Sequence, residues 1–213
     1  MAVGDAYNTA ALYKTAFGIT TTTQDTRIAS VLLAVSRYIE RRLDRFFNQD
    51  ASVVERLYEQ HSRRLLIDGR PALMLDDIST TTGLIVKQDE NVDGSVAADT
   101  AWTLNTDFIL WPYNADKGPE PQPWTALVVP SWSSKTFIDA ARFSVTAKFG
   151  WAAVPSAIAQ AAIELAAIVM ADSPRATTRI VEGVDATMSL SAGAQSIIDR
   201  LIESYGDNGL AFS

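Results

Sequence analysis

The sequence predicts an α+β protein in which a helical bundle carries a large antiparallel β-rich insertion. Near both ends of the chain, apolar residues recur every three or four positions, the period of a helix with one buried face. In the middle, short β-branched or alternating runs are separated by Gly, Pro, Asn and Asp, the pattern of strands and turns. We therefore expect the 213 residues to form a single domain, with residues 1–50 and 151–213 as the bundle and residues 51–150 as the insertion.

Two helices are expected in the N-terminal part. The first spans Asn8–Phe17 and ends at Gly18, a residue that adopts the left-handed conformation at little cost. Thr22 and Asp25 match a capping box, in which each side chain covers an unpaired backbone donor. The second helix, about Gln24–Phe47, has the clearest apolar stripe of the chain, formed by Ile28, Val31, Leu32, Val35, Ile39, Leu43 and Phe46.

The polar face of this second helix carries charges of both signs, Arg41 and Arg45 among the basic ones. Such a face is usually a solvated surface whose charges pair along the helix. It could also contact a neighbouring subunit, and the sequence leaves both interpretations open.

The β-rich part begins with a predicted hairpin, in which Val53–Glu59 pairs with Arg64–Asp68 around Gln60, His61 and Ser62. The other predicted strands are Leu73–Ile78, Leu84–Gln88, Trp102–Leu104, Asp107–Trp111, Thr125–Val129 and Arg142–Phe149. So many short strands between turn residues indicate an antiparallel sheet or a small barrel.

The segment Pro112–Pro123 is too rich in proline to be interior sheet, because proline supplies no ladder donor. We interpret it as an exposed loop. Its aromatic residue Tyr113 and the following Trp124 make it a candidate contact with another protein.

In Arg142–Phe149, the apolar and polar residues alternate, as in a strand with one wet face. Gly150 and Trp151 follow as a turn, and Pro155 is well placed to open the alanine-rich helix predicted over Ser156–Asp172. The many alanines of this helix favour close packing, within the bundle or against a second copy.

The C-terminal part ends in a predicted helix, Ala194–Tyr205, that stops at Gly206. The preceding segment Ala176–Leu190 fits neither helix nor strand. The tail Gly206–Ser213 carries Leu210 and Phe212, two apolar residues where an exposed terminus is expected, and is a second candidate contact.

The composition restricts the possible chemistry. Cysteine is absent, which excludes disulfides and thiolate nucleophiles, and the single histidine, His61, has no nucleophile motif nearby. With 18 basic and 25 acidic residues, the net charge of −7 is unlike that of a protein that grips DNA phosphates. No glycine-rich phosphate loop and no membrane-length apolar run is present. We expect no catalytic residue, no cofactor and no metal, and therefore no enzyme.

Two acidic motifs have a functional and a structural interpretation. Asp89–Gly94 reproduces the first half of an EF-hand loop, but Thr100 stands where the bidentate glutamate belongs, and the same residues are typical of a tight turn. Asp76 and Asp77 could serve acid–base chemistry, yet neighbouring strand residues point to opposite faces. Helix capping or edge-strand charge is the preferred interpretation for this pair.

Five tryptophans are concentrated in and around the β-rich part: Trp102, Trp111, Trp124, Trp132 and Trp151. Aromatic rings of this kind can stack on sugars or bases, but core and interface packing explains them at least as well.

The order of several motifs resembles that of the head–tail connector, or adaptor, proteins of tailed bacteriophages. The long helix ends in Tyr38–Phe47, the β-rich part contains Gly69–Leu73, and Lys-Phe-Gly-Trp (148–151) precedes the Val-Pro pair that opens a helix. The resemblance covers most of the chain, although the β-rich part is longer than in the family.

This resemblance implies a structural virion protein without catalytic role. It implies a ring, typically dodecameric in the family, that sits below the portal protein, extends the DNA channel and docks the stopper or tail. DNA would pass through the lumen without specific binding, and the protein would assemble in the host cytoplasm and remain at the head–tail junction. Tyr113, Trp124, Arg41, Arg45, Leu210 and Phe212 are the expected interface residues.

Two other functions stay open at this point. One is a carbohydrate- or receptor-binding β module that uses exposed tryptophans. The other is a hydrolase that uses Asp and Glu, with Ca²⁺ at Asp89–Gly94.

Deleting the tail Gly206–Ser213 is expected to leave a folded monomer that no longer docks on portal-bearing particles, because the apolar residues of the tail are assigned to that contact. Co-sedimentation with the particles measures docking, and circular dichroism checks the fold. Docking equal to that of the full chain would contradict the assignment.

Overall fold

The computed structural model describes residues 4–139, 141–171 and 192–206, and these form two compact units. The helical unit comprises Met1–Asn48 and Val154–Ser213, and the β unit comprises Gln49–Ala153. The described residues confirm the α+β class. The segment 176–190 and the tail residues Leu210 and Phe212, discussed above, lie outside them.

In the helical unit, α1 (Ala10–Phe17) begins and ends as its sequence predicts. The Thr9 hydroxyl accepts a hydrogen bond from the Leu12 N–H at 3.2 Å and caps the helix. Gly18 ends it in the left-handed conformation, with φ of 64°.

Helix α2 (Asp25–Leu43) buries the predicted stripe from Ile28 to Leu43, but both of its ends differ from the prediction. Gln24 occupies the N-cap position and no side chain caps the helix among the described residues, so the capping box is wrong. Asp25 instead binds Lys14 of α1 at 2.8 Å. The helix ends before Asp44, which takes a φ of 50°; because the chain leaves the helical path there, Phe47 is buried while the predicted Phe46 is 54% exposed.

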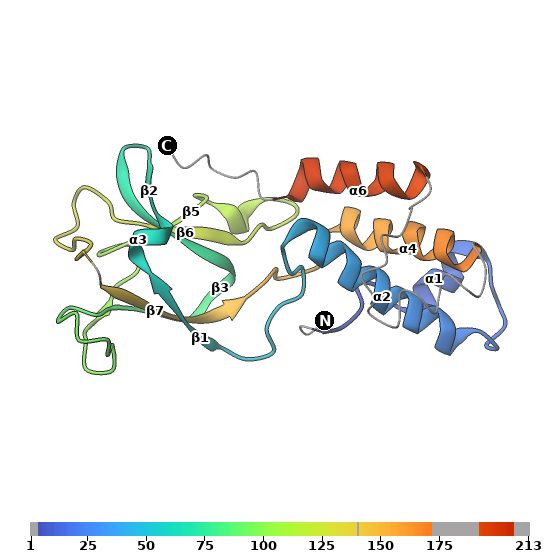
Figure 1. The fold of residues 1–213 in the computed structure, drawn as a ribbon, viewed down its shortest axis with the longest axis horizontal. Coiled ribbons are helices and arrows are strands. Elements are labelled where there is room, and N and C mark those ends of the chain that lie inside the picture. Colours follow the sequence, from blue (N-terminus) through green and yellow to red (C-terminus); the bar gives the residue numbers. More distant parts are fainter. Residues whose placement is uncertain (1–3, 140, 172–191, 207–213) are drawn as a thin grey trace. The chain divides into compact units, whose positions relative to one another are not determined.

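The C-terminal helices of this unit are α4 (Ser156–Ala171) and α6 (Ala192–Tyr205). Helix α4 packs against both α2 and α6, as Figure 1 shows. Its alanines therefore serve close packing inside the bundle. The helix begins at Ser156, as predicted, and the Pro155 carbonyl accepts from the Ala159 N–H at 3.0 Å.

A buried polar network joins the start of the chain to α2. The Tyr7 hydroxyl donates to Glu40 Oε1 at 2.7 Å and accepts from the Phe47 N–H at 3.2 Å. Arg37 completes the pairing of the Glu40 carboxylate at 2.6 Å. Burial raises the pKa of Glu40, and the bonds from Tyr7 and Arg37 oppose that rise. This network holds the N-terminal segment on the helix without leaving the carboxylate unpaired.

The β unit is a seven-stranded antiparallel sheet in the described residues, built around one long strand, β3 (Arg70–Gln88). Its path runs β1-β7-β3-β6-β5, and β2 and β4 also pair with β3. The other strands are β1 (Val54–Glu59), β2 (Arg64–Ile67), β4 (Ala101–Trp102), β5 (Ile109–Trp111), β6 (Trp124–Val128) and β7 (Arg142–Phe149). The bounds of β7 agree with the prediction.

Strand β3 replaces two predicted strands, Leu73–Ile78 and Leu84–Gln88. The start of β3 pairs with β6 and its end with β7, and the register shifts between Met74 and Ile78 and again between Ile78 and Ile85. These irregularities let one strand bend and serve both halves of the sheet. The polar, glycine-containing stretch Ser79–Gly83 therefore bends the strand rather than interrupting it.

The predicted hairpin of Val53–Glu59 with Arg64–Asp68 is wrong. Strand β1 pairs with β7, strand β2 pairs with β3, and the short helix α3 (Gln60–Arg63) connects β1 to β2. The hairpin in this region joins β2 and β3 through Asp68 and Gly69, whose φ angles of 51° and 73° are those of a two-residue turn. The side chain of His61 is outside those that the structure describes.

The core of the β unit lies on one face of the bent sheet. It contains Leu73, Ile78, Val86, Leu127, Phe143 and Val145, together with other apolar residues of β1, β3, β4, β5 and β7. A second, smaller cluster around Ala72, Ala126 and Val128 lies on the opposite face of the first half of β3. Among the helices that the structure describes, none has the length and apolar character needed to cross a membrane.

Replacing Tyr7 with Phe is expected to lower the free energy of unfolding by roughly 1–3 kcal/mol, because the Glu40 carboxylate loses a buried donor and the Phe47 N–H loses its acceptor. Chemical denaturation measures the loss. The exposed Tyr113→Phe is the matched control, expected to change stability by less than about 0.5 kcal/mol. Equal effects of the two substitutions would show that the Tyr7 hydroxyl contributes nothing.

Candidate interaction surface

The proline-rich segment between β5 and β6 is an ordered loop. It opens with a cis peptide bond between Trp111 and Pro112 and contains the short helix η1 (Ala115–Lys117). The Gln122 N–H donates to the Ala115 carbonyl at 2.9 Å and closes the loop on itself. An open hollow in this loop is lined by the segment Pro112–Ala115 together with Gly118–Glu120 and Gln122.

The predicted interface residues of the β unit stand at the two ends of this loop. Tyr113 is 41% exposed. Trp124 begins β6, is half-buried and packs against the main core. Tyr113 therefore presents its ring to solvent, whereas Trp124 mainly anchors the loop.

The predicted interface residues of the helical unit lie at the end of α2. Arg41 is exposed. Arg45 is half-buried and its Nη1 donates to the Tyr205 carbonyl at 3.1 Å, so it ties the end of α2 to the end of α6. Leu210 and Phe212 are outside the described residues. Of the other predicted interface residues, Tyr113 and Trp124 belong to the β unit, and Arg41 and Arg45 belong to the helical unit.

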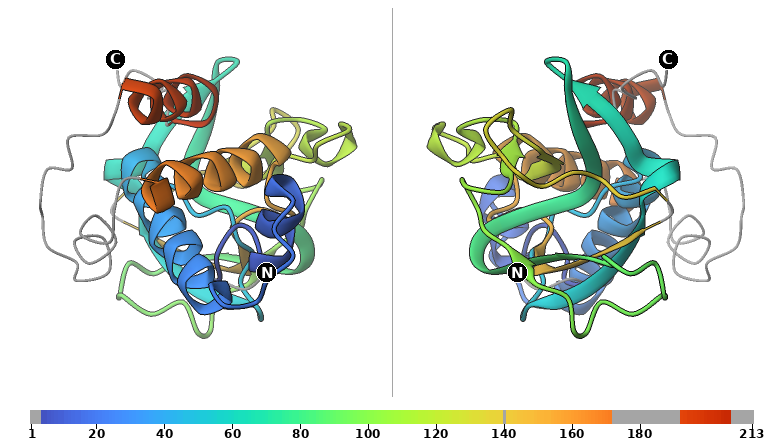
Figure 2. Two further views of the ribbon diagram at one scale, coloured as in Figure 1. Left: turned by 90° about the vertical axis from the view of Figure 1, so that its right-hand side faces the viewer. Right: turned by 90° about the vertical axis from the view of Figure 1, so that its left-hand side faces the viewer.

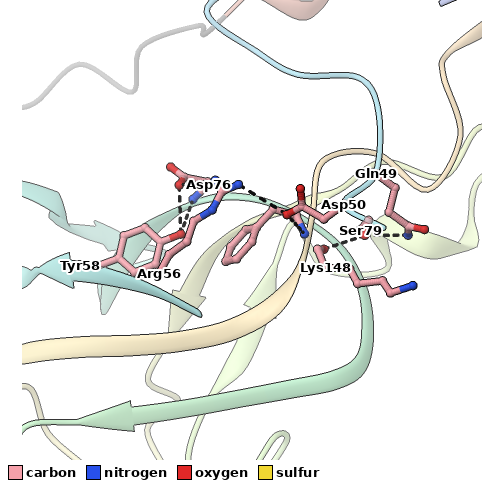
Figure 3. A network of polar contacts seen from close by, with 8 residues as sticks. Gln49, Asp50, Arg56, Tyr58, Asp76, Ser79 and Lys148 are labelled. Atoms are coloured by element: carbon pink, nitrogen blue, oxygen red, sulfur yellow. Dashed lines mark hydrogen bonds and ion pairs between the residues drawn. The ribbon is translucent and has the colours of Figure 1, made fainter. Parts of the chain in front are cut away.

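A polar network that the sequence did not reveal lies inside the β unit, centred on Asp76 (Figure 3). The Asp76 carboxylate pairs with Arg56 at 2.8 Å and with Arg63 at 3.0 Å. It also accepts a hydrogen bond from the Tyr58 hydroxyl at 3.2 Å. The Asp76 carboxylate on β3 thus holds β1 and α3 in place. Asp76 is therefore a structural ion-pair partner inside the sheet, and not the edge-strand charge that was expected.

The same network continues to the end of β7. Arg56 reaches Asp50 at 3.6 Å and lies over the Phe149 ring, 4.0 Å from its centroid. Asp50 in turn accepts from the Phe149 N–H at 3.2 Å. Nearby, Gln49 donates to the Ser79 hydroxyl, which donates to the Lys148 carbonyl (Figure 3). These bonds attach the first residues of the β unit to its last strand.

Asp77 serves a different partner from Asp76, in agreement with the prediction that the two carboxylates do not share one site. Its carboxylate accepts from the Trp151 indole N–H at 3.0 Å, and its carbonyl accepts from the Gly150 N–H at 2.7 Å. Gly150 has a φ of 95°, a conformation that glycine adopts without strain. The glycine-tryptophan turn is therefore fixed to β3 as the chain leaves β7.

Burial and charge act in opposite directions on the groups of the Asp76 network. Burial alone would raise the pKa of Asp76, but the bonds from Arg56 and Arg63 outweigh it and the pKa is lowered. Burial raises the pKa of Tyr58, and the negative charge of Asp76 adds to that rise. Tyr58 is thus a neutral donor and Asp76 a charged acceptor at neutral pH.

The acidic turn 89–94 is held by its own backbone. Asp89 is buried, and its two carboxylate oxygens accept from the N–H groups of Asp93 at 3.2 Å and Gly94 at 2.8 Å. These bonds are those of a tight turn, the structural interpretation of the motif. In the described part of the chain, no three Asp, Glu, His or Cys side chains are grouped as metal ligands.

The tryptophans are mostly packing residues. Trp102 and Trp151 are 5% and 4% exposed, and Trp111 and Trp124 are half-buried. Trp132 is 63% exposed and stands by itself in the loop after β6. Of the five tryptophans, all of them among the described residues, Trp132 is therefore the one with a mostly exposed ring, and a single ring is not a stacking row for a sugar chain.

Comparisons with known proteins leave the family open. No family model matches the chain, and no curated protein matches it. One solved structure that it resembles is described as the neck of an empty GTA particle with C6 symmetry. The identity is 18%, the match covers 90% of this chain and 87% of that one, and the TM-score is 0.48. A score at this level establishes neither a shared fold nor a shared role.

Replacing Asp76 with Asn is expected to destabilise the protein at neutral pH, and the difference from wild type should shrink as the pH falls from about 6 to about 2. The folded-state pKa of Asp76 lies below its ordinary value of 3.8, so its contribution is complete above that value and is lost as the pH falls through the folded-state pKa.

Chemical denaturation across this pH range measures the difference. Asp139→Asn is the matched control, since its side chain is 94% exposed and its pairing with Arg64 contributes little. A cost of Asp76→Asn that stays constant over the whole range would contradict the assignment of the charged network.

Proposed function

We propose that this chain is a structural subunit of the head–tail junction of a tailed-phage-like particle. In this role, copies of the chain form a ring below the portal protein, extend the DNA channel and offer a docking surface to the stopper or tail. The protein acts through its shape and its contacts, and not as an enzyme. Assembly takes place in the host cytoplasm, and the mature location is the virion.

The junction from β7 to α4 carries this proposal. In the sequence it is the most characteristic of the motifs that resemble the connector family. In the structure its turn is held by hydrogen bonds to β3. Strand β7 ends at Phe149, Gly150 and Trp151 bond to Asp77, and α4 begins at Ser156 after Pro155. The likeness to the GTA neck is too weak to add support.

The polar chemistry of the described residues also supports a structural role. Buried Asp89 and Glu40 and the half-buried Asp76 bond to backbone donors, tyrosines or arginines of the same unit. Side chains used in this way hold elements in place, because buried polar groups are paired within the fold.

The net charge supports passage of DNA without binding. A ring of subunits that each carry −7 repels phosphates at its lumen, so DNA can slide through it. A head-to-tail ring also needs two different complementary surfaces on each subunit, and the loops at the ends of the sheet are available for this purpose.

Two measurements test the proposal. The first is electron microscopy of the purified protein with and without portal-bearing particles, and the second is the mass of the protein in solution. We expect rings, either free or assembled at the portal vertex, and no density on control particles that lack the portal. A chain that remains monomeric beside portal vertices would overturn the proposal.

A further inference from the structure

We infer that the tip of the β2–β3 hairpin is a site of spontaneous covalent modification, at which Asp68 converts to isoaspartate through the backbone nitrogen of Gly69. The Asp-Gly pair occurs a second time in the sequence, at Asp93 and Gly94, and the fold protects that second pair from the same reaction. The inference concerns the chemistry of the folded chain and is independent of the proposed function.

The reaction uses no reagent other than water. The Gly69 nitrogen attacks the carboxyl carbon of the Asp68 side chain, a C–N bond forms, and the N–H proton leaves with the carboxyl hydroxyl group as water. The product is a cyclic succinimide, and water then adds to one of its two carbonyl groups. Breaking the new C–N bond restores aspartate, whereas breaking the original peptide bond leaves isoaspartate. The atoms balance, and nothing is oxidised or reduced.

The first pair is open to this attack. Asp68 and Gly69 are both exposed, and open space lies where a side chain on Gly69 would stand. A glycine nitrogen is also the least hindered nucleophile that can follow an aspartate, because glycine has no Cβ. Both views of Figure 2 show the teal tip of this hairpin projecting beyond the strands that it joins.

Neither reacting group of the first pair has to leave a partner. The backbone pairing of the hairpin closes at Ile67 and Arg70, one residue to each side of the pair. Within the described part of the chain, the Gly69 N–H has no acceptor and the Asp68 carboxylate has no donor. Local opening costs the least free energy at an exposed loop tip of this kind.

Both reacting groups of the second pair are held. The Gly94 N–H donates to Asp89 Oδ2 at 2.8 Å, and Asp93 Oδ1 accepts from the Ser95 N–H at 2.8 Å. The Asp93 N–H donates to the other oxygen of Asp89, at 3.2 Å, and Asp89 is buried. Attack by the Gly94 nitrogen therefore requires that its N–H first leave a charged, buried acceptor, and bonds of this kind are stronger than neutral ones.

The modification would alter the hairpin. In isoaspartate the main chain runs through the former side chain, so it is one carbon longer at this position. A two-residue turn fixes the register of its strands, and an added carbon no longer fits it. We expect the pairing of β2 with β3 to loosen next to the turn, where buried Ile67 faces Arg70.

Peptide mapping of the aged protein tests the inference. Trypsin separates the two pairs into the peptides 65–87 and 88–117, because it does not cut between Arg70 and Pro71. The folded protein is incubated at mildly acidic pH, where part of the carboxyl groups are protonated, and is then digested briefly. Liquid chromatography with electron-transfer fragmentation identifies isoaspartate at each position. Hydrogen exchange of the β2 amides in the same samples measures the loosening.

We expect isoaspartate to form at Asp68 at least about tenfold faster than at Asp93, because the Gly94 N–H must break a charge-assisted hydrogen bond first. In denaturant the two rates should converge, since a glycine follows each aspartate and the fold no longer distinguishes them. This comparison uses the unchanged sequence, so it does not depend on the folding of any variant.

Asp89→Ala tests the protection, and it is expected to raise the rate at Asp93 toward that at Asp68. Glu90→Ala is the matched control, because Glu90 is an exposed neighbour that pairs with Lys135 and should leave both rates unchanged. Circular dichroism checks that both variants are folded.

Three outcomes would overturn the inference. The first is equal rates at Asp68 and Asp93 in the folded protein. The second is isoaspartate at Asp68 that forms in denaturant alone. The third, a folded Asp89→Ala variant with an unchanged rate at Asp93, would overturn the assigned protection. None of these measurements depends on ring assembly, so a failure here leaves the proposed function intact.

Discussion

The β unit depends on the hydrogen bonding of one bent strand. Each backbone N–H and C=O in a buried strand needs a partner, and the nineteen residues of β3 find theirs on β2, β4, β6 and β7. No single neighbour could follow the strand through its bend, so the neighbours change where the register shifts. Asp76 and Asp77 lie at the first of these irregularities, and each directs its carboxylate to a different element: Asp76 to β1 and α3, and Asp77 to the turn after β7.

The polar networks give the subunit defined surfaces. In the β unit the Asp76 network connects the edge strand β1 and the helix α3 to the central strand β3, and in the helical unit Tyr7 and Glu40 hold the N-terminal segment on α2. A buried carboxylate with two or three donors is stable in one arrangement, because moving it away from any of these donors leaves a buried charge without compensation. Such rigidity suits a protein that works by fitting its neighbours, since ordering a surface on binding costs free energy.

The candidate interaction surface was accessible from the sequence only in part. The proline loop could be predicted because proline excludes itself from a ladder, and Tyr113 is exposed there as expected. Trp124 was assigned to the same surface from its aromatic character, yet it packs against the core, since a strand residue faces inward or outward according to a register that the sequence does not reveal. The Asp76 network escaped notice because its members come from β1, α3 and β3. One signal for this network was present in the sequence. Arg56 and Tyr58 are two residues apart on β1 and therefore share a face, so the Arg56 guanidinium lies on the same side of the strand as the buried Tyr58 and needs a negative partner there.

The sequence by itself determined the elements whose signals are local. The apolar stripe of α2, the glycine stop of α1, the alternation of β7 and the glycine-tryptophan turn are all encoded within a few neighbouring residues. Only the tertiary structure decided the strand partners. It joined two predicted strands into β3, paired β1 with β7 instead of β2, and moved the hairpin turn to Asp68 and Gly69. Pairing depends on backbone bonds and side-chain packing between segments far apart in the chain, and the periodicity of one segment carries no information about which other segment completes its ladder.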